Sequence, residues 1–322
     1  MTTDRLTDVH AHFVTAGYVA AARAAGVQHP DGMPGWPEWS VEQHLDLMDR
    51  GGIGKSYLSV SSPGVHFGDD TAARALAREV NEFGAGVRAE RPERFGQFAS
   101  LPLPDVEGAR AEAGYALDVL GADGVIVESN HHGVYLGDPR LEPLWADLDR
   151  RAAVVFVHPT SPPHAEDLAL GRPRPMIEFI FDTARTAADL LFRGVLARYG
   201  GIRWILTHGG GALPLLADRM ELVRGLVGDR ALSGTEEGGG PTVLEQLGRL
   251  WYDMAGTPFP RQIAALDAAF GTDRLLYGSD YCWTPIGMAL DQVAAVDVAE
   301  PPSADDTWRS LTSRNARRLF GG

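Results

Sequence analysis

Four histidines and one aspartate have the residue types and positions of a metal-dependent catalytic site, and each closes a short apolar run. They are His10, His12, His158, His208 and Asp280. His10 and His12 are two residues apart, so an extended strand would direct both imidazoles to the same side. Imidazoles together with a carboxylate suit a zinc-like divalent ion that keeps one position open for water or substrate. We therefore expect a metal site, although each histidine alone could be a hydrogen-bonded core residue.

His208 could be a further nitrogen ligand or a general acid and base beside the metal. We favour the second role, because His10, His12, His158 and Asp280 already make a shell of four ligands. An imidazole exchanges protons near neutral pH, so a histidine next to bound water or substrate is suited to proton transfer.

The elements that must position these residues are eight short apolar runs, each closed by a polar, glycine or proline break. Such runs are typical of buried parallel strands. Their bounds are 6–13, 53–60, 95–101, 122–128, 153–158, 203–208, 250–255 and 275–280. Catalytic residues of β/α barrels gather where the strands end, which is where the four histidines and Asp280 fall.

Helical patterns occupy the gaps between these runs. In residues 70–91, Ala73, Leu76, Ala77, Val80 and Phe83 form one apolar stripe, and Pro92 ends the pattern. Similar patterns cover 106–120, 141–151, 177–199, 260–270 and 304–320. The alternation predicts a single domain over residues 1–322, an α/β fold of the (β/α)8 TIM barrel type, with an open doubly wound sheet as the alternative.

Two segments do not fit the repeat. Residues 15–40 predict a long loop insertion after the first strand, and residues 225–242 predict a glycine-rich loop after the sixth. Trp36 and Trp39 of the first loop could cover a substrate pocket or could simply pack against the barrel.

Composition narrows the possible partners. The chain has 322 residues with 29 Lys+Arg and 43 Asp+Glu, a formal net charge of −14 that disfavours nucleic acid. No apolar run is long enough to span a membrane, and the first residues lack a signal pattern, so we expect a cytoplasmic protein. The one cysteine, Cys282, can form neither an intrachain disulfide nor a thiolate zinc cluster.

Five motifs follow one another from His10 to about Phe320: DVHAHF, SNHHGVYLGDP, VFVHPT, THGGGALP and YGSD. In this order and spacing the chain resembles the metal-dependent decarboxylase branch of the amidohydrolase superfamily. That branch includes aminocarboxymuconate-semialdehyde decarboxylase, gamma-resorcylate decarboxylase and 6-methylsalicylate decarboxylase. The resemblance implies one divalent metal ion, zinc first and manganese second, and no organic cofactor.

The resemblance also implies roles for single residues. His10, His12, His158 and Asp280 would bind the metal. His208 would be the catalytic histidine that is not a ligand, and Asp280 would be catalytic as the proton donor to the substrate.

Two further residues bear on assembly and on the number of metals. Arg219 matches an arginine that relatives place near the substrate carboxylate of a neighbouring subunit, which implies a homodimer, although it could be an ordinary helix-surface arginine. Binuclear members of the superfamily use a carboxylated lysine at the end of the fourth strand. Here that strand ends at Glu128 and the only lysine is Lys55, so one metal is expected.

The expected activity is non-oxidative decarboxylation of a small aromatic or enolic carboxylic acid. Residues 178–190 most resemble the 6-methylsalicylate subgroup, so an ortho-hydroxybenzoate is the expected substrate. The alternative enzyme is a mononuclear metal-dependent hydrolase of a lactone, ester or amide, with His208 activating water. A third possibility is a barrel that binds a metal or ligand without turnover. His131, His132 and Cys282 lie near the expected mouth without an assigned role.

Overall fold

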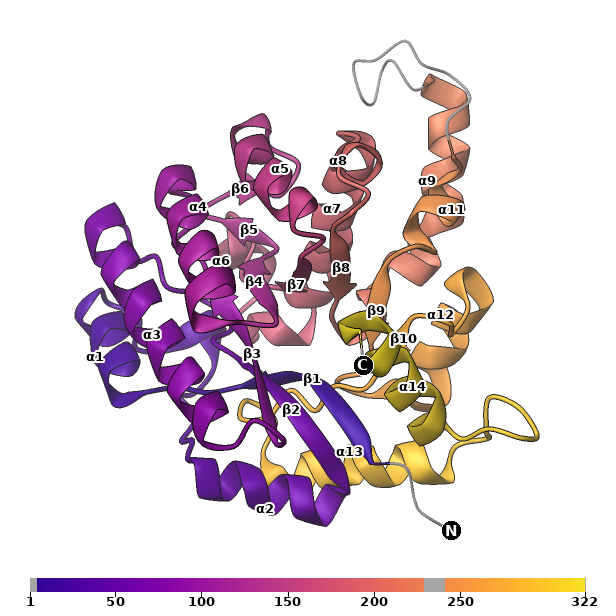
Figure 1. Cartoon of the computed structure of the whole chain (residues 1–322). Coiled ribbons are helices and arrows are strands. Elements are labelled where there is room, and N and C mark those ends of the chain that lie inside the picture. The colour runs from indigo at the N-terminus through magenta and orange to yellow at the C-terminus, as the bar shows by residue number, and fades with distance from the viewer. Residues whose placement is uncertain (1–4, 229–240, 322) are drawn as a thin grey trace.

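Eight parallel strands form the barrel that the sequence predicts. The computed structural model describes residues 5–228 and 241–321. The strand order is β1-β2-β3-β4-β7-β8-β9-β10, and bridges from Asp8 to Tyr277 and from Ala11 to Tyr281 join the two ends of the sheet (Figure 1). The bounds are β1 (Leu6–His12), β2 (Ile53–Ser59), β3 (Phe95–Ser100), β4 (Gly124–Glu128), β7 (Val154–His158), β8 (Arg203–Leu206), β9 (Trp251–Asp253) and β10 (Leu275–Leu276).

Helices surround the strands as the alternation requires. Their bounds are α1 (Ala16–Ala24), α2 (Val41–Gly51), α3 (Asp70–Glu90), α4 (Val106–Tyr115), α5 (Glu142–Arg150), α6 (Ala165–Leu168), α7 (Glu178–Phe192), α8 (Val195–Arg198), α9 (Leu213–Val227), α11 (Val243–Leu247), α12 (Ile263–Phe270), α13 (Ile286–Val298) and α14 (Trp308–Phe320). In α3, Asp69 caps the first turn and the predicted apolar stripe is buried as far as Val80, whereas Phe83 is 40% exposed. None of the described helices combines the length and apolarity that a membrane crossing needs.

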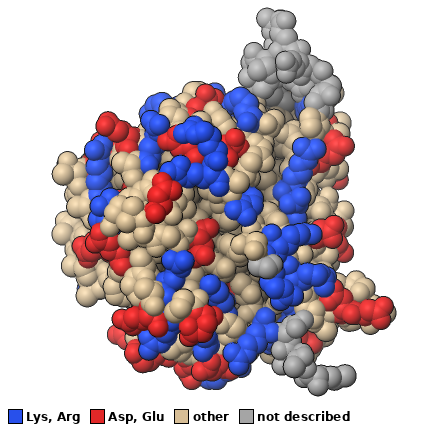
Figure 2. Space-filling model, in the orientation of Figure 1, with Lys and Arg blue, Asp and Glu red and all other residues tan. Residues whose placement is uncertain are grey.

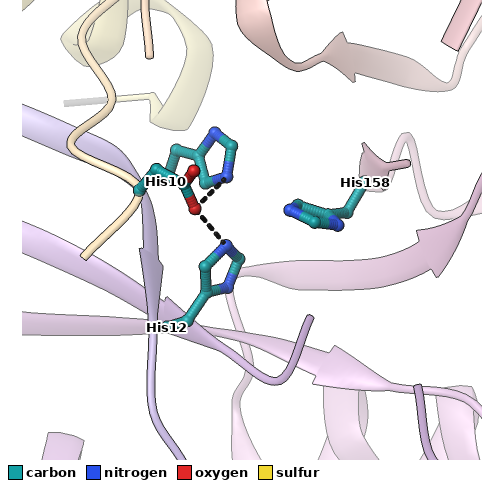
Figure 3. Close-up of side chains that lie close together, drawn as sticks. His10, His12 and His158 are labelled. Carbon is teal, nitrogen blue, oxygen red and sulfur yellow. Dashed lines mark ion pairs between the residues drawn. The ribbon is translucent and has the colours of Figure 1, made fainter. Parts of the chain in front are cut away.

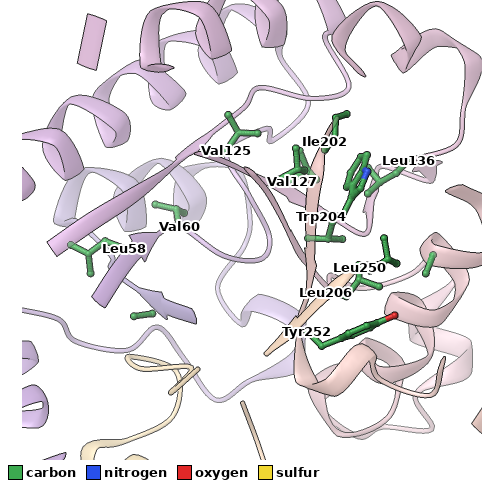
Figure 4. Close-up of a cluster of buried hydrophobic side chains, with 14 of the residues drawn as sticks. Leu58, Val60, Val125, Val127, Leu136, Ile202, Trp204, Leu206, Leu250 and Tyr252 are labelled. Atoms are coloured by element: carbon green, nitrogen blue, oxygen red, sulfur yellow. The ribbon is translucent and has the colours of Figure 1, made fainter. Parts of the chain in front are cut away.

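The core has two apolar layers, one on each side of the strands. Side chains such as Val9, Phe98 and Ile205 fill the interior of the barrel. Their neighbours along the strands face outward and pack beneath the helices, as Val125, Val127, Trp204 and Leu206 do in Figure 4. This alternation follows from the period of two along a strand, and it leaves the polar strand ends to form the mouth.

The structure corrects several expected bounds. Residues 15–40 are not simply a loop, because Thr15 caps the helix α1 and a short 3₁₀ turn follows at Pro30–Gly32. A small hairpin of β5 (Asn130–His131) and β6 (Val134–Tyr135) follows β4 and was not expected, and the helices α2, α9 and α13 lie outside the predicted helical ranges. In the second expected loop, 225–242, α9 continues to Val227 and residues 229–240 lie outside the described part of the chain.

The two tryptophans of the first insertion pack against the barrel. Trp36 contacts Tyr18 and Trp283, and Trp39 contacts Phe13 and donates a hydrogen bond to a buried histidine of α2. Neither side chain lines the active-site pocket described below. Trp36 and Trp39 therefore pack against the barrel and its loops in this structure.

Charged side chains are intermixed over the surface. Figure 2 shows basic and acidic groups side by side on the face in view, and many of the arginines make ion pairs, such as Arg110 with Asp147 and Arg309 with Asp297. Exposed pairs of this kind contribute little to stability.

Candidate active site

The strand ends bring four of the predicted residues into one cluster at the mouth of the barrel. His10 and His12 come from β1, His158 ends β7, and Asp280 follows β10 (Figure 3). One ligand atom from each lies within 4.8 Å of all the others. The Asp280 Oδ1 atom is 3.4 Å from both His10 Nε2 and His12 Nε2. The structure thus assembles the metal ligand set that the sequence proposes.

The donor atoms of this cluster fit a divalent cation. The Nε2 atoms of His10 and His12 are buried and have no hydrogen-bond partner, which is costly unless a further group binds them. The opposite ring nitrogens are held in place: His10 Nδ1 is 2.8 Å from Asp253, His12 Nδ1 is 2.9 Å from Ser59 and His158 Nδ1 is 2.7 Å from the Pro159 carbonyl. Such partners orient histidines toward a metal.

Charge in the cluster is strongly biased. Burial opposes protonation of His10, but the carboxylates of Asp253 and Asp280 outweigh it and raise the pKa of His10 to about 10. Burial lowers the pKa of His12 to about 4. Burial also opposes ionisation of Asp280, yet the adjacent histidines keep its pKa well below the usual value. At neutral pH the cluster therefore contains the ionised Asp280 and a neutral His12, while His10 is in its positively charged, doubly protonated form.

Metal binding should release a proton from this cluster. A cation on His10 Nε2 must displace the proton that its pKa of about 10 retains, whereas His12, with a pKa of about 4, has none to lose. Between these values the apparent affinity should rise about tenfold, or about 1.4 kcal/mol, per pH unit. Calorimetry at pH 7.5 in two buffers of different ionisation enthalpy should give about one proton released per metal. Affinity that is flat between pH 6 and 8 contradicts this expectation.

His208 lies beside the cluster. It follows β8, and its Nε2 is 3.6 Å from Asp280 Oδ2. Its backbone N–H donates to Asp253 at 2.9 Å, its carbonyl accepts from the Gln262 amide, and its φ of 54° is in the left-handed region. Strained backbone of this kind clusters at functional sites. The three glycines that follow make the turn into α9, where a Cβ on Gly211 would overlap the Ile180 carbonyl.

Asp253 is a site residue that the sequence reasoning did not single out. It ends β9 and is fully buried, with one carboxylate oxygen on His10 Nδ1 and the other accepting from the N–H groups of His208 and Ala255, both at 2.9 Å. It therefore positions both His10 and His208. The sequence signal that could have indicated Asp253 is a carboxylate near the end of the seventh apolar run, 250–255.

Replacing Asp253 with asparagine should lower metal affinity about 10- to 100-fold. The amide keeps the shape but removes the charge beside His10 and can accept through only one atom. Equilibrium dialysis against a metal buffer measures the loss. A matched control is Asp291→Asn, an exposed position on α13, which should bind metal like the wild type. Unchanged affinity of Asp253→Asn contradicts the positioning role.

A second buried carboxylate holds the two ends of the sheet together. Asp8 accepts hydrogen bonds from Ser279 N at 3.0 Å, Ser279 Oγ at 2.6 Å and His10 N at 3.1 Å. Burial raises the pKa of Asp8 to about 7. These bonds fix His10 relative to Ser279, the residue before Asp280, although 269 residues separate His10 and Ser279 along the chain.

A pocket of about 370 Å³ opens next to the cluster, with His158, His208 and Asp280 in its wall. Its other side is largely apolar and includes Met33, Phe179, Ile180 and Trp283. No lysine or arginine is among its lining residues in the described part of the chain. A flat apolar ring fits such a wall, and any negative charge on the ligand would have to be neutralised at the histidine cluster.

Asp31 also lines this pocket and was not anticipated. It accepts hydrogen bonds from Ser62 Oγ at 2.7 Å and from Ser161 Oγ at 2.5 Å, which tie the insertion after β1 to the loops after β2 and β7. Burial raises the pKa of this carboxyl group. No local sequence pattern marks Asp31, because its partners are far along the chain.

Arg219 does not line the active-site pocket of its own chain. It is exposed on α9, beside a separate surface hollow between α7 and α9 that also contains Phe181 and Arg185. A role at the substrate would therefore require a neighbouring subunit. Cys282 is buried, which raises its pKa, and it lies outside the pocket lining.

The described residues contain one group of three or more closely placed metal-ligating side chains, the cluster at the mouth. Lys55 is on β2 with its amino group over the Tyr57 ring. Glu128, at the end of β4, lies 3.6 Å from His158 Nδ1, and burial raises its pKa well above the usual value. Burial therefore disfavours the ionised form in which this carboxyl group would bind a second ion.

Comparison with known proteins agrees with this geometry. The chain is 37% identical to decarboxylase yanB of Aspergillus niger, over 98% of this chain and 87% of the other. It is 35% identical to 6-methylsalicylic acid decarboxylase of Penicillium expansum, over 97% and 95%. A crystal structure of an amidohydrolase II superimposes with a TM-score of 0.89 at 30% identity, covering 98% and 100%. The profile of the Amidohydrolase family, Amidohydro_2, matches residues 7–322, and the chain belongs to this family.

Proposed function

We propose that this protein is a metal-dependent, non-oxidative decarboxylase of a small aromatic carboxylic acid, an ortho-hydroxybenzoate of the 6-methylsalicylate type. The observation that carries the proposal is the buried cluster of three histidines and Asp280 facing a ring-sized apolar pocket, with the non-ligand His208 beside it. The similarity to a relative named 6-methylsalicylic acid decarboxylase supports the substrate class.

His10, His12, His158 and Asp280 would hold one divalent ion, zinc first and manganese second, because nitrogen and oxygen donors accept both. When bound, such an ion supplies positive charge that can fix the substrate carboxylate and the adjacent phenolic oxygen. Elemental analysis of protein purified without chelator distinguishes the two metals. A metal content below about 0.1 per chain contradicts the ligand assignment, because a buried site with four protein ligands should bind its metal tightly.

The pocket walls would orient the ring. Phe179, Ile180 and Trp283 offer apolar surface to the ring and its methyl group, which suits an alkyl-substituted benzoate better than one with a second carboxylate. Because the described lining residues include no cation, this chain itself supplies no partner for an additional carboxylate.

The bond to be broken joins the ring to its carboxylate carbon. A proton delivered to the carboxyl-bearing ring carbon makes a new C–H bond, and the electrons of the C–C bond return to the ring as carbon dioxide leaves. We propose that Asp280 delivers this proton with the help of His208, and the 3.6 Å between Asp280 Oδ2 and His208 Nε2 supports this pairing. Because the adjacent histidines hold the pKa of Asp280 low, Asp280 would carry the proton only transiently while it passes the proton to the ring carbon.

A panel of hydroxybenzoates tests the proposal. Metal-loaded enzyme should release one carbon dioxide per phenol formed from 6-methylsalicylate, more slowly from salicylate, and should not act on benzoate. Chelator-treated enzyme is the control. No release from any member overturns the proposal, and incorporation of oxygen-18 from water into the product of an ester or lactone would establish a hydrolase instead.

We also propose a homodimer in which Arg219 of each subunit reaches the substrate of the other. The exposed apolar side chains of α9, Leu215, Leu222 and Leu226, are 78%, 59% and 75% exposed, and Figure 1 shows this helix extending beyond the barrel. Leu215, Leu222 and Leu226 follow one another at spacings of seven and four residues, so they share one face of the helix, and a contiguous exposed apolar face is typical of an interface.

The double variant Leu222→Glu/Leu226→Glu should convert the dimer to a monomer, because burying two carboxylates in an apolar interface is unfavourable. Light scattering measures the mass. Val119→Glu/Val298→Glu, exposed apolar positions on other elements, should remain dimeric. Wild-type protein that is monomeric at micromolar concentration contradicts the dimer, and full activity of Arg219→Ala contradicts the role of the arginine.

A further inference from the structure

Asp31 places a carboxylate in the wall of the active-site pocket that the proposed reaction does not use. It lies in the 3₁₀ turn Pro30–Gly32 of the insertion after β1, and it lines the same pocket as His158 and Asp280. It does not belong to the cluster of metal-ligating side chains at the mouth. Neither metal binding nor proton transfer therefore accounts for a carboxylate in this otherwise largely apolar wall.

The groups that hydrogen-bond to Asp31 are neutral donors. Ser161 donates to Oδ1 from its backbone N–H at 3.2 Å and from its hydroxyl at 2.5 Å. The Ser62 hydroxyl donates to Oδ2 at 2.7 Å. Hydrogen bonds donated to a carboxylate favour its charged form, so they oppose the rise in the pKa of Asp31 that burial causes.

One acceptor position of Asp31 stays open. An ionised carboxylate offers about four lone pairs on its two oxygens. Ser161 takes two of them on Oδ1, and Ser62 takes one on Oδ2. The remaining pair on Oδ2 has no partner among the described residues, and the side chain borders the pocket. A donor that completes the hydrogen bonds of Asp31 therefore has to come from the pocket.

The location of Asp31 indicates which part of a substrate it meets. Its serine partners follow β2 and β7, whereas His208 follows β8 and Asp280 follows β10. In the proposed reaction the substrate carboxylate and the adjacent phenolic oxygen bind at the metal cluster. A negative group outside that cluster repels both of them. The group that binds Asp31 is therefore a neutral donor elsewhere on the ring.

We propose that Asp31 determines specificity by accepting a hydrogen bond from a second ring hydroxyl, so that the preferred substrate is a 6-methylsalicylate with one additional hydroxyl group. This inference rests on the proposed function, because it takes the ring and its carboxylate from there. A hydrogen bond from a phenol to a carboxylate is charge-assisted and stronger than one between neutral groups. A pocket built to bind a hydroxyl group discriminates against the analogue that lacks it.

The test compares 6-methylsalicylate with its derivatives that carry one more hydroxyl at ring position 3, 4 or 5, each beside the methyl ether of that hydroxyl. Metal-loaded wild type should show kcat/KM at least about tenfold higher for one hydroxylated acid than for the parent acid and for the ether. Asp31→Asn should reduce this preference to less than about threefold, because an amide has one acceptor oxygen and the serines occupy it. Asp31→Gly should do the same, and glycine adopts the φ of 52° without strain.

Two control variants separate recognition from loop structure. Ser161→Ala removes a hydroxyl that ties the loops together but leaves the charge of Asp31, so it should keep the preference. Asp167→Asn, an exposed position on α6 outside the pocket lining, should also keep it. Loss of the preference in Ser161→Ala, or its retention in both variants at position 31, overturns the role of Asp31.

Binding of the corresponding phenols, which have no carboxylate to lose, makes the test independent of decarboxylation. By calorimetry, metal-loaded wild type should bind at least one dihydroxytoluene about tenfold more tightly than 3-methylphenol, and Asp31→Asn should bind the two alike. Equal binding by wild type overturns the role of Asp31 even if carbon dioxide is released from the acids. A preference that Asp31→Asn abolishes supports that role even if no acid is decarboxylated.

Discussion

Asp280→Asn should reduce kcat for decarboxylation by at least about 10³-fold and weaken metal binding at the same time. Asp280 is the only carboxylate of the proposed ligand set, and its Oδ1 lies 3.4 Å from two ligand nitrogens while its Oδ2 faces His208. The amide keeps the shape of the side chain, but it loses the charge that attracts the metal and cannot relay a proton. Steady-state rates and metal content on the same samples measure both effects.

The Asp280→Asn variant should distinguish a loss of catalysis from a loss of folding. Asp280 has φ of 57°, and asparagine is among the residues that tolerate this region, so the variant should still fold, which the circular dichroism spectrum of the metal-free protein checks. Asp291→Asn on α13 should keep wild-type kcat. A variant at position 280 that retains one metal per chain and more than a tenth of the wild-type rate contradicts both roles of Asp280.

His208→Asn should lower kcat about 10²- to 10⁴-fold with one metal still bound per chain. The histidine lies outside the ligand cluster, and its main-chain bonds to Asp253 and Gln262 do not depend on the side chain. The φ of 54° again suits asparagine. Because only proton transfer is removed, KM should change much less than kcat.

The outcome discriminates between the two roles considered for His208. If His208→Asn loses its metal, the residue is a ligand and the cluster has been assigned incorrectly. If His208→Asn keeps both its metal and the wild-type rate, a group other than His208 supplies the proton for decarboxylation. His29→Asn, an exposed histidine outside the pocket lining, is the control for a general effect of removing an imidazole and should retain full kcat.

The sequence alone was sufficient for the barrel and the candidate ligands. Buried parallel strands are recognisable in the sequence as apolar runs, and the period of two along a strand puts His10 and His12 on one face. Closure of the barrel then brings the strand ends together whatever their separation along the chain. His158 and Asp280 could thus be joined to His10 without knowledge of any side-chain contact. The cluster in the structure agrees with that inference.

Only the tertiary structure decided what supports the ligands and shapes the pocket. Asp253 acts through His10 and His208, which β1 and β8 bring to it, and Asp31 enters the pocket wall because serines of two other loops bind it. Likewise, Arg219 lies away from its own pocket because α9 turns it outward. Strand periodicity is a local property that the residues themselves carry. Loop placement and hydrogen-bonded support depend on partners 31 to 243 residues away along the chain, which come together only after the chain has folded.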